Sequence, residues 1–300
     1  MENFVAIITY LLIGMVFRHL PDFPAETGKV LNSFVIYVSL PALVLLKIPD
    51  LDFSQNVMVP AVMPWVMLIC SVSFILVLAR VLTWERPTTG CLLLMVPLGN
   101  TSFLGIPMVK AFWGEQAIPY AVLYDQLGSF LALATYGSVV LALFGSERCR
   151  PTWGGVVKRI LSFPPFLALT LALLLRSVAY PAMVSAVLSA MAATLVPVVM
   201  VAVGFQLTLR LNRAMISQLS IGLTLKLIVA PLVAFLLCTA VGLKGEAVQV
   251  AVFEAGMPPM VSAGALAIMA NLSPVLTAAL VGIGIVASFI TLPILHALLS

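Results

Sequence analysis

The chain has 300 residues, of which 62% are hydrophobic and only 9% are charged, and its formal net charge is +4. A soluble domain carries about a quarter charged residues, so this composition excludes a soluble globule and indicates a polytopic membrane protein. The positive charge does not indicate a nucleic-acid partner, because the basic residues lie in short loops between apolar runs, where membrane topology places them.

The first apolar run has no basic region before it, so we expect a retained helix rather than a cleaved signal peptide. A membrane-spanning helix needs about 20 apolar residues. Ten such runs follow one another along the chain: 3–18, 28–47, 57–80, 88–112, 118–144, 164–180, 181–208, 217–242, 245–271 and 273–298. The sequence therefore predicts an all-α membrane protein of ten transmembrane helices.

Lysine and arginine are distributed unequally over the loops between these runs. The odd-numbered loops carry most of them: Arg18, Lys29, Arg80, Arg86, Arg148, Arg150, Lys158, Arg159, Arg210 and Arg213. The even-numbered loops carry Lys47, Lys110, Arg176 and Lys244. Because basic loops stay on the cytoplasmic side, we expect both termini outside, in the inner or plasma membrane of a prokaryote.

The longest loop, residues 146–163, is basic and divides the chain into residues 1–145 and 164–300, with five runs each. Two halves with an odd number of helices enter the membrane from opposite sides, so homologous halves would form an inverted repeat. Pro107 and Pro259 are separated by nearly the same number of residues as Pro41 and Pro197. These offsets favour a duplicated five-helix unit joined by a cytoplasmic linker.

The fourth run is interrupted by helix breakers and polar residues. Gly99, Gly105 and Pro107 disfavour a continuous helix, and the triplet Asn100-Thr101-Ser102 places polar groups where lipid would be expected. Irregular backbone at membrane depth is tolerated only where it faces protein, water or a ligand. We therefore expect a discontinuous helix here.

The ninth run contains a matching break at Met257-Pro258-Pro259, close to Glu254. Two broken helices at corresponding positions of two halves indicate a binding site near the middle of the membrane. The N-termini of half-helices suit an anion, and their C-terminal carbonyls suit a cation. The alternative is that the prolines only kink packed helices. The candidate substrate-binding residues are Asn100, Thr101, Ser102, Gly105, Pro107, Met257, Pro258, Pro259 and Ser262.

Three ionisable residues lie inside apolar runs: Asp125, Lys226 and Glu254. Such residues are costly in hydrocarbon and are expected to face the interior of the helix bundle with a partner. Burial favours the neutral form of a carboxyl group, so Asp125 or Glu254 could exchange a proton during transport. We assign ion coupling to Asp125, Gln126, Glu254 and Lys226, with Lys226 paired to Glu254 or Asp125. The alternative is a static salt bridge.

No phosphate-binding loop, nucleophile elbow or zinc-protease motif occurs in the sequence, and its four cysteines and two histidines show no metal-binding spacing. We therefore expect neither an enzyme nor a cofactor. We expect no metal site other than a candidate Na⁺ site near Asn100 and Glu254.

One stretch of the chain resembles a known family: Asn100-Thr-Ser-Phe-Leu-Gly-Ile-Pro-Met-Val-Lys-Ala-Phe-Trp-Gly-Glu115. It is similar to the auxin efflux carrier family, which includes plant PIN carriers and bacterial malonate-type permeases of the bile acid/auxin carrier superfamily. That family shows Asn-Thr, then Gly-Ile-Pro, then Lys-Ala and an aromatic residue before Gly. Pro41 and Thr291-Leu-Pro293 also look like it.

The resemblance implies two inverted five-helix repeats in which the fourth and ninth helices cross at their broken middles. Residues 1–47 and 164–212 would form a scaffold, with a homodimer interface, and residues 57–145 and 217–298 would form a moving transport core. The family's asparagine and proline at the first crossing correspond to Asn100 and Pro107. The proline of the second crossing corresponds to Pro258 or Pro259.

These features together predict a secondary transporter of a small organic anion, a carboxylate that is auxin-like or malonate-like, in contact with membrane lipid. Unlike the plant members, the chain has no long hydrophilic central loop, and Glu254 lies beside its second break. This favours coupling to H⁺ or Na⁺. The alternative function is a membrane channel or a ligand-binding sensor without coupled transport. The direction of transport is left open.

Overall fold

A computed structural model of the chain describes residues 2–49, 51, 57–146, 152–178, 180–208 and 215–300. Within these residues the protein is helical and contains no strand, and an isolated antiparallel bridge joins Gly99 and Pro259. Helices predominate because a segment in lipid must pair its own backbone polar groups. Four basic residues used for the predicted orientation lie outside the described residues: Arg148, Arg150, Arg210 and Arg213.

The chain divides into two compact units that each draw on separate parts of the sequence. The first unit consists of Met1–Ser54, Ser102–Val122 and Lys158–Leu207, and the second consists of Gln55–Thr101, Leu123–Val157 and Thr208–Ser300. Two helices continue from the second unit into the first: η2 (Thr101–Gly105) and α9 (Trp153–Leu161).

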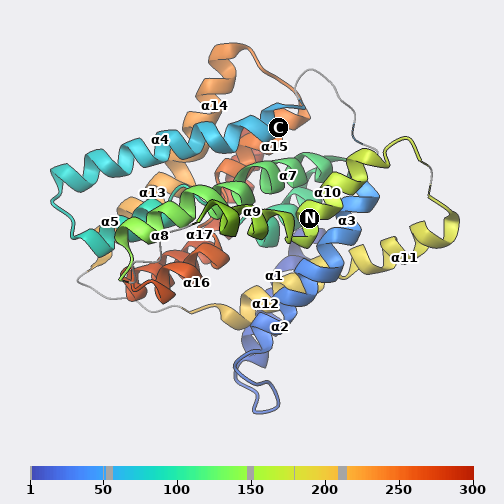
Figure 1. Cartoon of the computed structure of the whole chain (residues 1–300), viewed down its shortest axis with the longest axis horizontal. Coiled ribbons are helices and arrows are strands. Elements are labelled where there is room, and N and C mark those ends of the chain that lie inside the picture. The colour runs from blue at the N-terminus through green and yellow to red at the C-terminus, as the bar shows by residue number, and fades with distance from the viewer. Residues whose placement is uncertain (1, 50, 52–56, 147–151, 179, 209–214) are drawn as a thin grey trace. The chain divides into compact units, whose positions relative to one another are not determined.

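The other helices of the first unit are drawn in blue, green and yellow in Figure 1. They are α1 (Glu2–Phe17), α2 (Thr27–Phe34), η1 (Val35–Ser39), α3 (Leu40–Lys47), α6 (Ile106–Trp113), η3 (Glu115–Ala117), α7 (Ile118–Leu123), α10 (Pro164–Leu174), α11 (Ala182–Ala193) and α12 (Leu195–Gln206).

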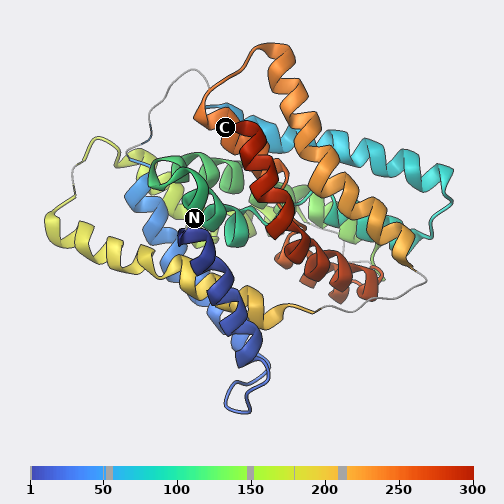
Figure 2. The same ribbon diagram turned by 180° about the vertical axis from the view of Figure 1, so that it is seen from behind.

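Glycines allow α1 and α12 of the first unit to pack backbone against backbone (Figure 2). A Cβ atom at Gly14 would lie 2.1 Å from the carbonyl oxygen of Val201, and one at Gly204 would lie 2.0 Å from that of Leu11. Small residues at such contacts are typical of membrane helix pairs, whose association depends on close packing.

The second unit contains the longest helices. Its members are α4 (Val59–Val81), α5 (Arg86–Met95), η4 (Tyr124–Phe130), η5 (Leu133–Gly137), α8 (Ser138–Phe144), α13 (Ile216–Thr224), η7 (Leu225–Val229), α14 (Ala230–Val241), α15 (Glu246–Ala255), α16 (Val261–Met269) and α17 (Pro274–Leu299). Figure 2 shows α14, α16 and α17 from behind.

The apolar interior of the second unit has two parts. In the first, α5 packs against α16 and α17 through fully buried side chains such as Leu92, Ala267 and Leu280. In the second, α15 packs against α4 and α14, with Ala234 and Ala251 between them. Glu254 and the break that follows it therefore lie at the end of a helix that is held on several sides.

Among the described residues, six helices are long and apolar enough to cross a membrane: Thr27–Lys47, Val59–Val81, Glu115–Phe144, Ala182–Gln206, Ile216–Val241 and Pro274–Leu299. The bent pair Gly154–Leu161 and Pro164–Leu174 raises this to seven, and α1 is a shorter apolar helix. The fourth and ninth predicted runs are split at their breaks into pieces below the length of a span. The described residues thus support six or seven spans, and ten remains a prediction.

Candidate functional site

The chain leaves helical geometry at both predicted breaks. Helix α5 ends at Met95 and η2 begins at Thr101, and α15 ends at Ala255 and α16 begins at Val261. Residues 96–100 and 256–260 are therefore non-helical, and each break lies between two short helices. Proline and glycine account for both interruptions, because neither supports the hydrogen-bonded interior of a helix.

The two breaks lie against each other and pair through their main chains. The Asn100 N–H donates to the Pro258 carbonyl at 2.8 Å, and the Met260 N–H donates to the Leu98 carbonyl at 3.0 Å. These bonds flank the bridge between Gly99 and Pro259. Backbone groups freed from the helices are thus satisfied by protein, as irregular backbone at membrane depth requires.

A cluster of six buried polar side chains surrounds this junction, and each of them is at most 4% exposed. We call it the junction cluster: Asn100, Thr101, Asp125, Gln126, Lys226 and Glu254. Within it, the Thr101 hydroxyl donates to Asp125 Oδ1 and the Gln126 side-chain amide donates to Asp125 Oδ2, both at 2.6 Å. Both oxygens of the Asp125 carboxylate therefore accept a hydrogen bond.

The Lys226 ammonium lies where the two breaks meet. Its Nζ donates to the Ala255 carbonyl at 3.3 Å, just before the second break. On the other side, a Cβ atom at Gly99, in the first break, would lie 3.1 Å from the same Nζ. Lys226 also interacts electrostatically with Glu254, although among the described residues no ion pair within 4.0 Å joins it to a carboxylate.

Three side chains of the junction cluster have polar atoms that find no hydrogen-bond partner among the described residues. These atoms are Asn100 Nδ2, Gln126 Oε1 and both carboxylate oxygens of Glu254. A buried polar group left unpaired costs about 1–3 kcal/mol, and more if it is charged. Since most buried polar groups in native proteins are paired, this concentration at one place makes the junction cluster a candidate ligand site.

Three π-helices carry most of the junction cluster, and the sequence reasoning missed them. Thr101 lies in η2, Asp125 and Gln126 lie in η4, and Lys226 lies in η7. Such irregular turns often occur at functional sites. The sequence reasoning also missed Tyr124, which is buried in η4 next to Asp125. The only feature of the sequence that could have pointed to Tyr124 is its position next to Asp125.

The remaining predicted site residues lie in different elements and differ in burial. Met257, Pro258 and Pro259 are buried in the second break, and Ser262 is half-buried in α16. Ser102, Gly105 and Pro107 belong to the first unit, where Gly105 and Pro107 are buried and Ser102 is half-buried. The structure therefore brings together the predicted ion-coupling residues, the first part of the Asn-Thr motif and the second break.

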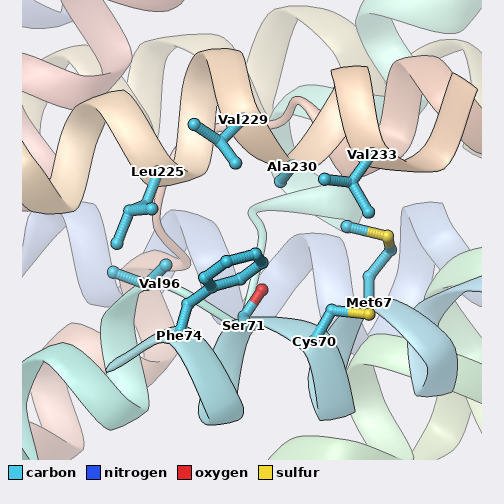
Figure 3. A pocket seen from close by; sticks show the side chains of 9 residues that line it. All are labelled: Met67, Cys70, Ser71, Phe74, Val96, Leu225, Val229, Ala230 and Val233. Atoms are coloured by element: carbon cyan, nitrogen blue, oxygen red, sulfur yellow. The ribbon is translucent and has the colours of Figure 1, made fainter. Parts of the chain in front are cut away.

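A small cavity in the second unit is lined in part by Val96, at the start of the first break, and by Leu225 of η7 (Figure 3). Side chains of α4 face those of η7 and α14 across it, and the lining residues are Met67, Cys70, Ser71, Phe74, Val96, Leu225, Val229, Ala230 and Val233. Its volume is about 10 Å³, which is the order of size that holds one water molecule. The cavity is therefore too small to be the substrate site in this conformation.

Metal-binding side chains do not gather in the part of the chain that the structure describes, where no group of three or more His, Cys, Asp or Glu residues could hold an ion. Cys149 lies outside that part. A cation at the junction cluster would instead depend on the oxygens of Glu254, Gln126 and the main chain, a set that suits a proton or Na⁺ better than a transition metal.

Comparison with known proteins gives consistent matches along the chain. A family described as "Membrane transport protein" matches residues 1–296. The chain is 25% identical over 303 residues to an uncharacterized transporter of Methanothermobacter thermautotrophicus, covering 98% of this chain and 96% of that protein. It is 26% identical over 268 residues to an uncharacterized transporter of Methanocaldococcus jannaschii, covering 86% and 85%.

Proposed function

The chain belongs to the membrane transport protein family, as the resemblance to the auxin efflux carriers predicted, and from this premise we propose that it is a secondary transporter of a small organic anion. Family membership and the apolar helices make it an integral membrane protein in a transporter family rather than in an enzyme class. One observation carries the proposal: a buried ammonium and unpaired polar groups lie where two broken helices meet.

The substrate we propose is a carboxylate, auxin-like or malonate-like. The free Nδ2 of Asn100 offers a hydrogen-bond donor, and the N-terminal ends of η2 and α16 begin directly after the two breaks. Helix N-termini favour negative charge. Lys226 adds a formal positive charge beside them, so the site combines the features that recognise a carboxylate.

The architecture we propose is ten spans in two inverted five-helix repeats, whose fourth and ninth helices cross at their breaks. The paired main chains of the two breaks support the crossing. We assign residues 1–47 and 164–212 to a scaffold that forms a homodimer, and residues 57–145 and 217–298 to a core that moves like an elevator. Most of the proposed scaffold lies in the first compact unit and most of the proposed core lies in the second. The exception is residues 102–122 of the core, which belong to the first unit.

Transport is coupled to H⁺ or Na⁺ in this proposal, through Asp125, Gln126, Glu254 and Lys226. Their burial supports it, because ionisable groups inside a membrane protein are retained mainly where they serve ion or proton movement. We place the protein in a prokaryotic plasma membrane with both termini outside, on the basis of the basic residues in the odd-numbered loops.

The test is uptake into proteoliposomes that contain the purified protein. Labelled acetate, malonate, succinate and indole-3-acetate are offered separately under an imposed pH gradient, an imposed Na⁺ gradient, or neither. We expect at least one anion to accumulate above its external concentration under one gradient.

Protein-free liposomes provide the control for passive entry of protonated acids. If none of the anions moves under any gradient, the proposal is wrong. Saturable binding of an anion without flux would instead identify a sensor, and flux that never exceeds the electrochemical equilibrium of the anion would identify a channel.

A further inference from the structure

We propose that Glu254 and the substrate carboxylate alternate as the counter-ion of Lys226, so that each anion enters the site together with one proton carried by Glu254. This inference rests on the proposed transport function and deepens it, because it selects the proton as the coupling ion. It is carried by the positions and hydrogen bonds of Lys226, Asp125 and Glu254 in the junction cluster.

A buried ammonium needs a counter-ion, because an unpaired charge in a low-dielectric interior is strongly disfavoured. The hydrogen bond that Lys226 makes goes to the neutral carbonyl of Ala255. Its opposite charge must come from a nearby carboxylate, and Glu254, which immediately precedes Ala255, interacts with it electrostatically. The charge of Lys226 is thus balanced by the Glu254 carboxylate, although the two side chains form no direct ion pair.

The two carboxylates of the junction cluster differ in the hydrogen bonds that protonation would disrupt. Both oxygens of Asp125 accept hydrogen bonds, from Thr101 and from Gln126. Both oxygens of Glu254 are buried, and neither accepts a hydrogen bond from the residues that the structure describes. A proton placed on Glu254 therefore disrupts no hydrogen bond, whereas one placed on Asp125 would compete with two donors. Asp125 acts as the fixed negative charge and Glu254 as the exchangeable one.

Charge balance then links the proton to the anion. When Asp125, Glu254 and Lys226 are all ionised, two negative charges face one positive charge in a buried site. A further carboxylate would leave two uncompensated negative charges, and like charges at close range in such a site repel strongly. A single proton on Glu254 restores the original balance and leaves Lys226 available to the substrate.

The other titratable groups around Glu254 do not replace it in this role. Asp125 and Lys226 are the charged groups that act on it, and Tyr124 lies close by on η4. The helices packed against α15, and α15 itself, carry further titratable side chains: Cys70 and Arg80 in α4, Cys238 in α14, His296 in α17 and Glu246 in α15.

The transport cycle moves one proton and one anion in the same direction. A proton from the water on one side binds a Glu254 oxygen, and Lys226 loses its counter-ion. The substrate carboxylate takes that place, with Asn100 Nδ2 as a second donor. On the other side the carboxylate leaves, the proton leaves Glu254, and the ionised Glu254 again balances Lys226. No covalent bond to the substrate forms or breaks.

The experiment compares wild type with Glu254→Gln in proteoliposomes, using labelled malonate, or indole-3-acetate if wild type accumulates only that anion. Because glutamine imitates the protonated glutamate, Glu254→Gln should still exchange external for internal anion, with rates that no longer depend on pH. It should fail to accumulate anion under a pH gradient. Glu246→Gln is the matched control, since it makes the same change at the start of the same helix, and it should accumulate anion as wild type does.

Lys226→Gln tests the other half of the pair. Removing one partner of a buried charge pair costs several kcal/mol, so we expect anion affinity to fall on the order of 100-fold, in exchange and in accumulation alike. Wild-type exchange by Lys226→Gln, or pH-driven accumulation by Glu254→Gln, would overturn the proposal.

A measurement on wild type alone keeps the proposal testable if a variant does not fold. With the membrane potential clamped at zero, a monovalent anion carried with one proton should reach an accumulation ratio equal to the imposed proton ratio, and a Na⁺ gradient at equal pH should drive nothing. Accumulation by the Na⁺ gradient would overturn the proton mechanism while leaving the proposed transporter intact. If wild type moves no anion at all, the proposed function itself fails.

Discussion

At the scale of single residues, Asn100 has two roles: its main chain serves the fold, and its side chain is available for binding. Its main-chain N–H joins the two breaks through the Pro258 carbonyl. Its side-chain Nδ2 is buried and has no hydrogen-bond partner in the described part of the chain. The main chain therefore contributes to the fold, and the side chain is available to a ligand.

Asn100→Ala should consequently weaken anion binding and leave the fold intact. A hydrogen bond to a charged group contributes roughly 1.5–3 kcal/mol, so we expect the affinity for the transported anion to fall by about 10-fold to 100-fold. Binding of the labelled anion to purified protein measures this, and the melting temperature in detergent checks the fold. An affinity equal to that of wild type would place the anion site elsewhere in the molecule.

At the scale of helices and other elements, close backbone contacts decide which segments can pack. In the first unit, α1 and α12 approach so closely at Gly14 and Gly204 that a side chain has no room at either position. In the second unit, α17 packs closely against the second break. A Cβ atom at Gly284 of α17 would lie only 2.8 Å from Pro259 Cδ, so a larger residue has no room there. Glycine thus determines the packing at both sites.

Gly204→Ala should destabilise the protein, because its Cβ would lie 2.0 Å from the Leu11 carbonyl oxygen and force α1 away from α12. Overpacking of this kind costs typically about 1–3 kcal/mol. We expect a lower melting temperature in detergent and a smaller yield of monodisperse protein in size-exclusion chromatography.

The matched control for this change is Gly154→Ala, since a Cβ atom at Gly154 would meet nothing within 4 Å. It makes the same chemical change in a helix, α9, and should leave the melting temperature unchanged or raise it slightly, because alanine favours a helix more than glycine does. Equal behaviour of Gly204→Ala and Gly154→Ala would contradict the close approach of α1 and α12.

At the scale of the whole molecule, family membership and orientation are the central properties. The family match over residues 1–296 confirms the relationship that the Asn100–Glu115 motif predicted. It assigns the molecule to membrane transport, and the two archaeal relatives are described as transporters without a named substrate. Substrate, coupling ion and transport mechanism are therefore proposals that rest on the junction cluster.

Orientation is testable with reporter fusions. Because an even number of spans places both termini on one side, and the basic odd-numbered loops are cytoplasmic in our prediction, alkaline phosphatase fused after Ser300 should be active. Green fluorescent protein at the same position should be dark. Reporters fused after residue 160, which lies in α9 within the predicted cytoplasmic linker 146–163, should give the opposite pattern. Fluorescence from the C-terminal fusion would contradict ten spans with both termini outside.

The amino-acid sequence by itself determined the membrane class, the family and the positions of both helix breaks. Each of these depends on local chemistry: apolar runs between Lys- and Arg-bearing loops, prolines and glycines within apolar runs, and the motif that begins at Asn100. It also singled out Asp125, Lys226 and Glu254, because an ionisable residue inside an apolar run is conspicuous without any knowledge of its neighbours.

Only the tertiary structure decided how these residues relate to one another. The hydrogen bond from Thr101 to Asp125 and the approach of Lys226 to Ala255 and Gly99 join residues far apart in the chain. The structure also shows that the Glu254 oxygens have no hydrogen-bond partner among the residues it describes. The sequence left open whether Lys226 pairs with Glu254 or with Asp125. Packing decides such contacts, because it depends on several helices at once, whereas hydropathy and helix breaking act within a single segment.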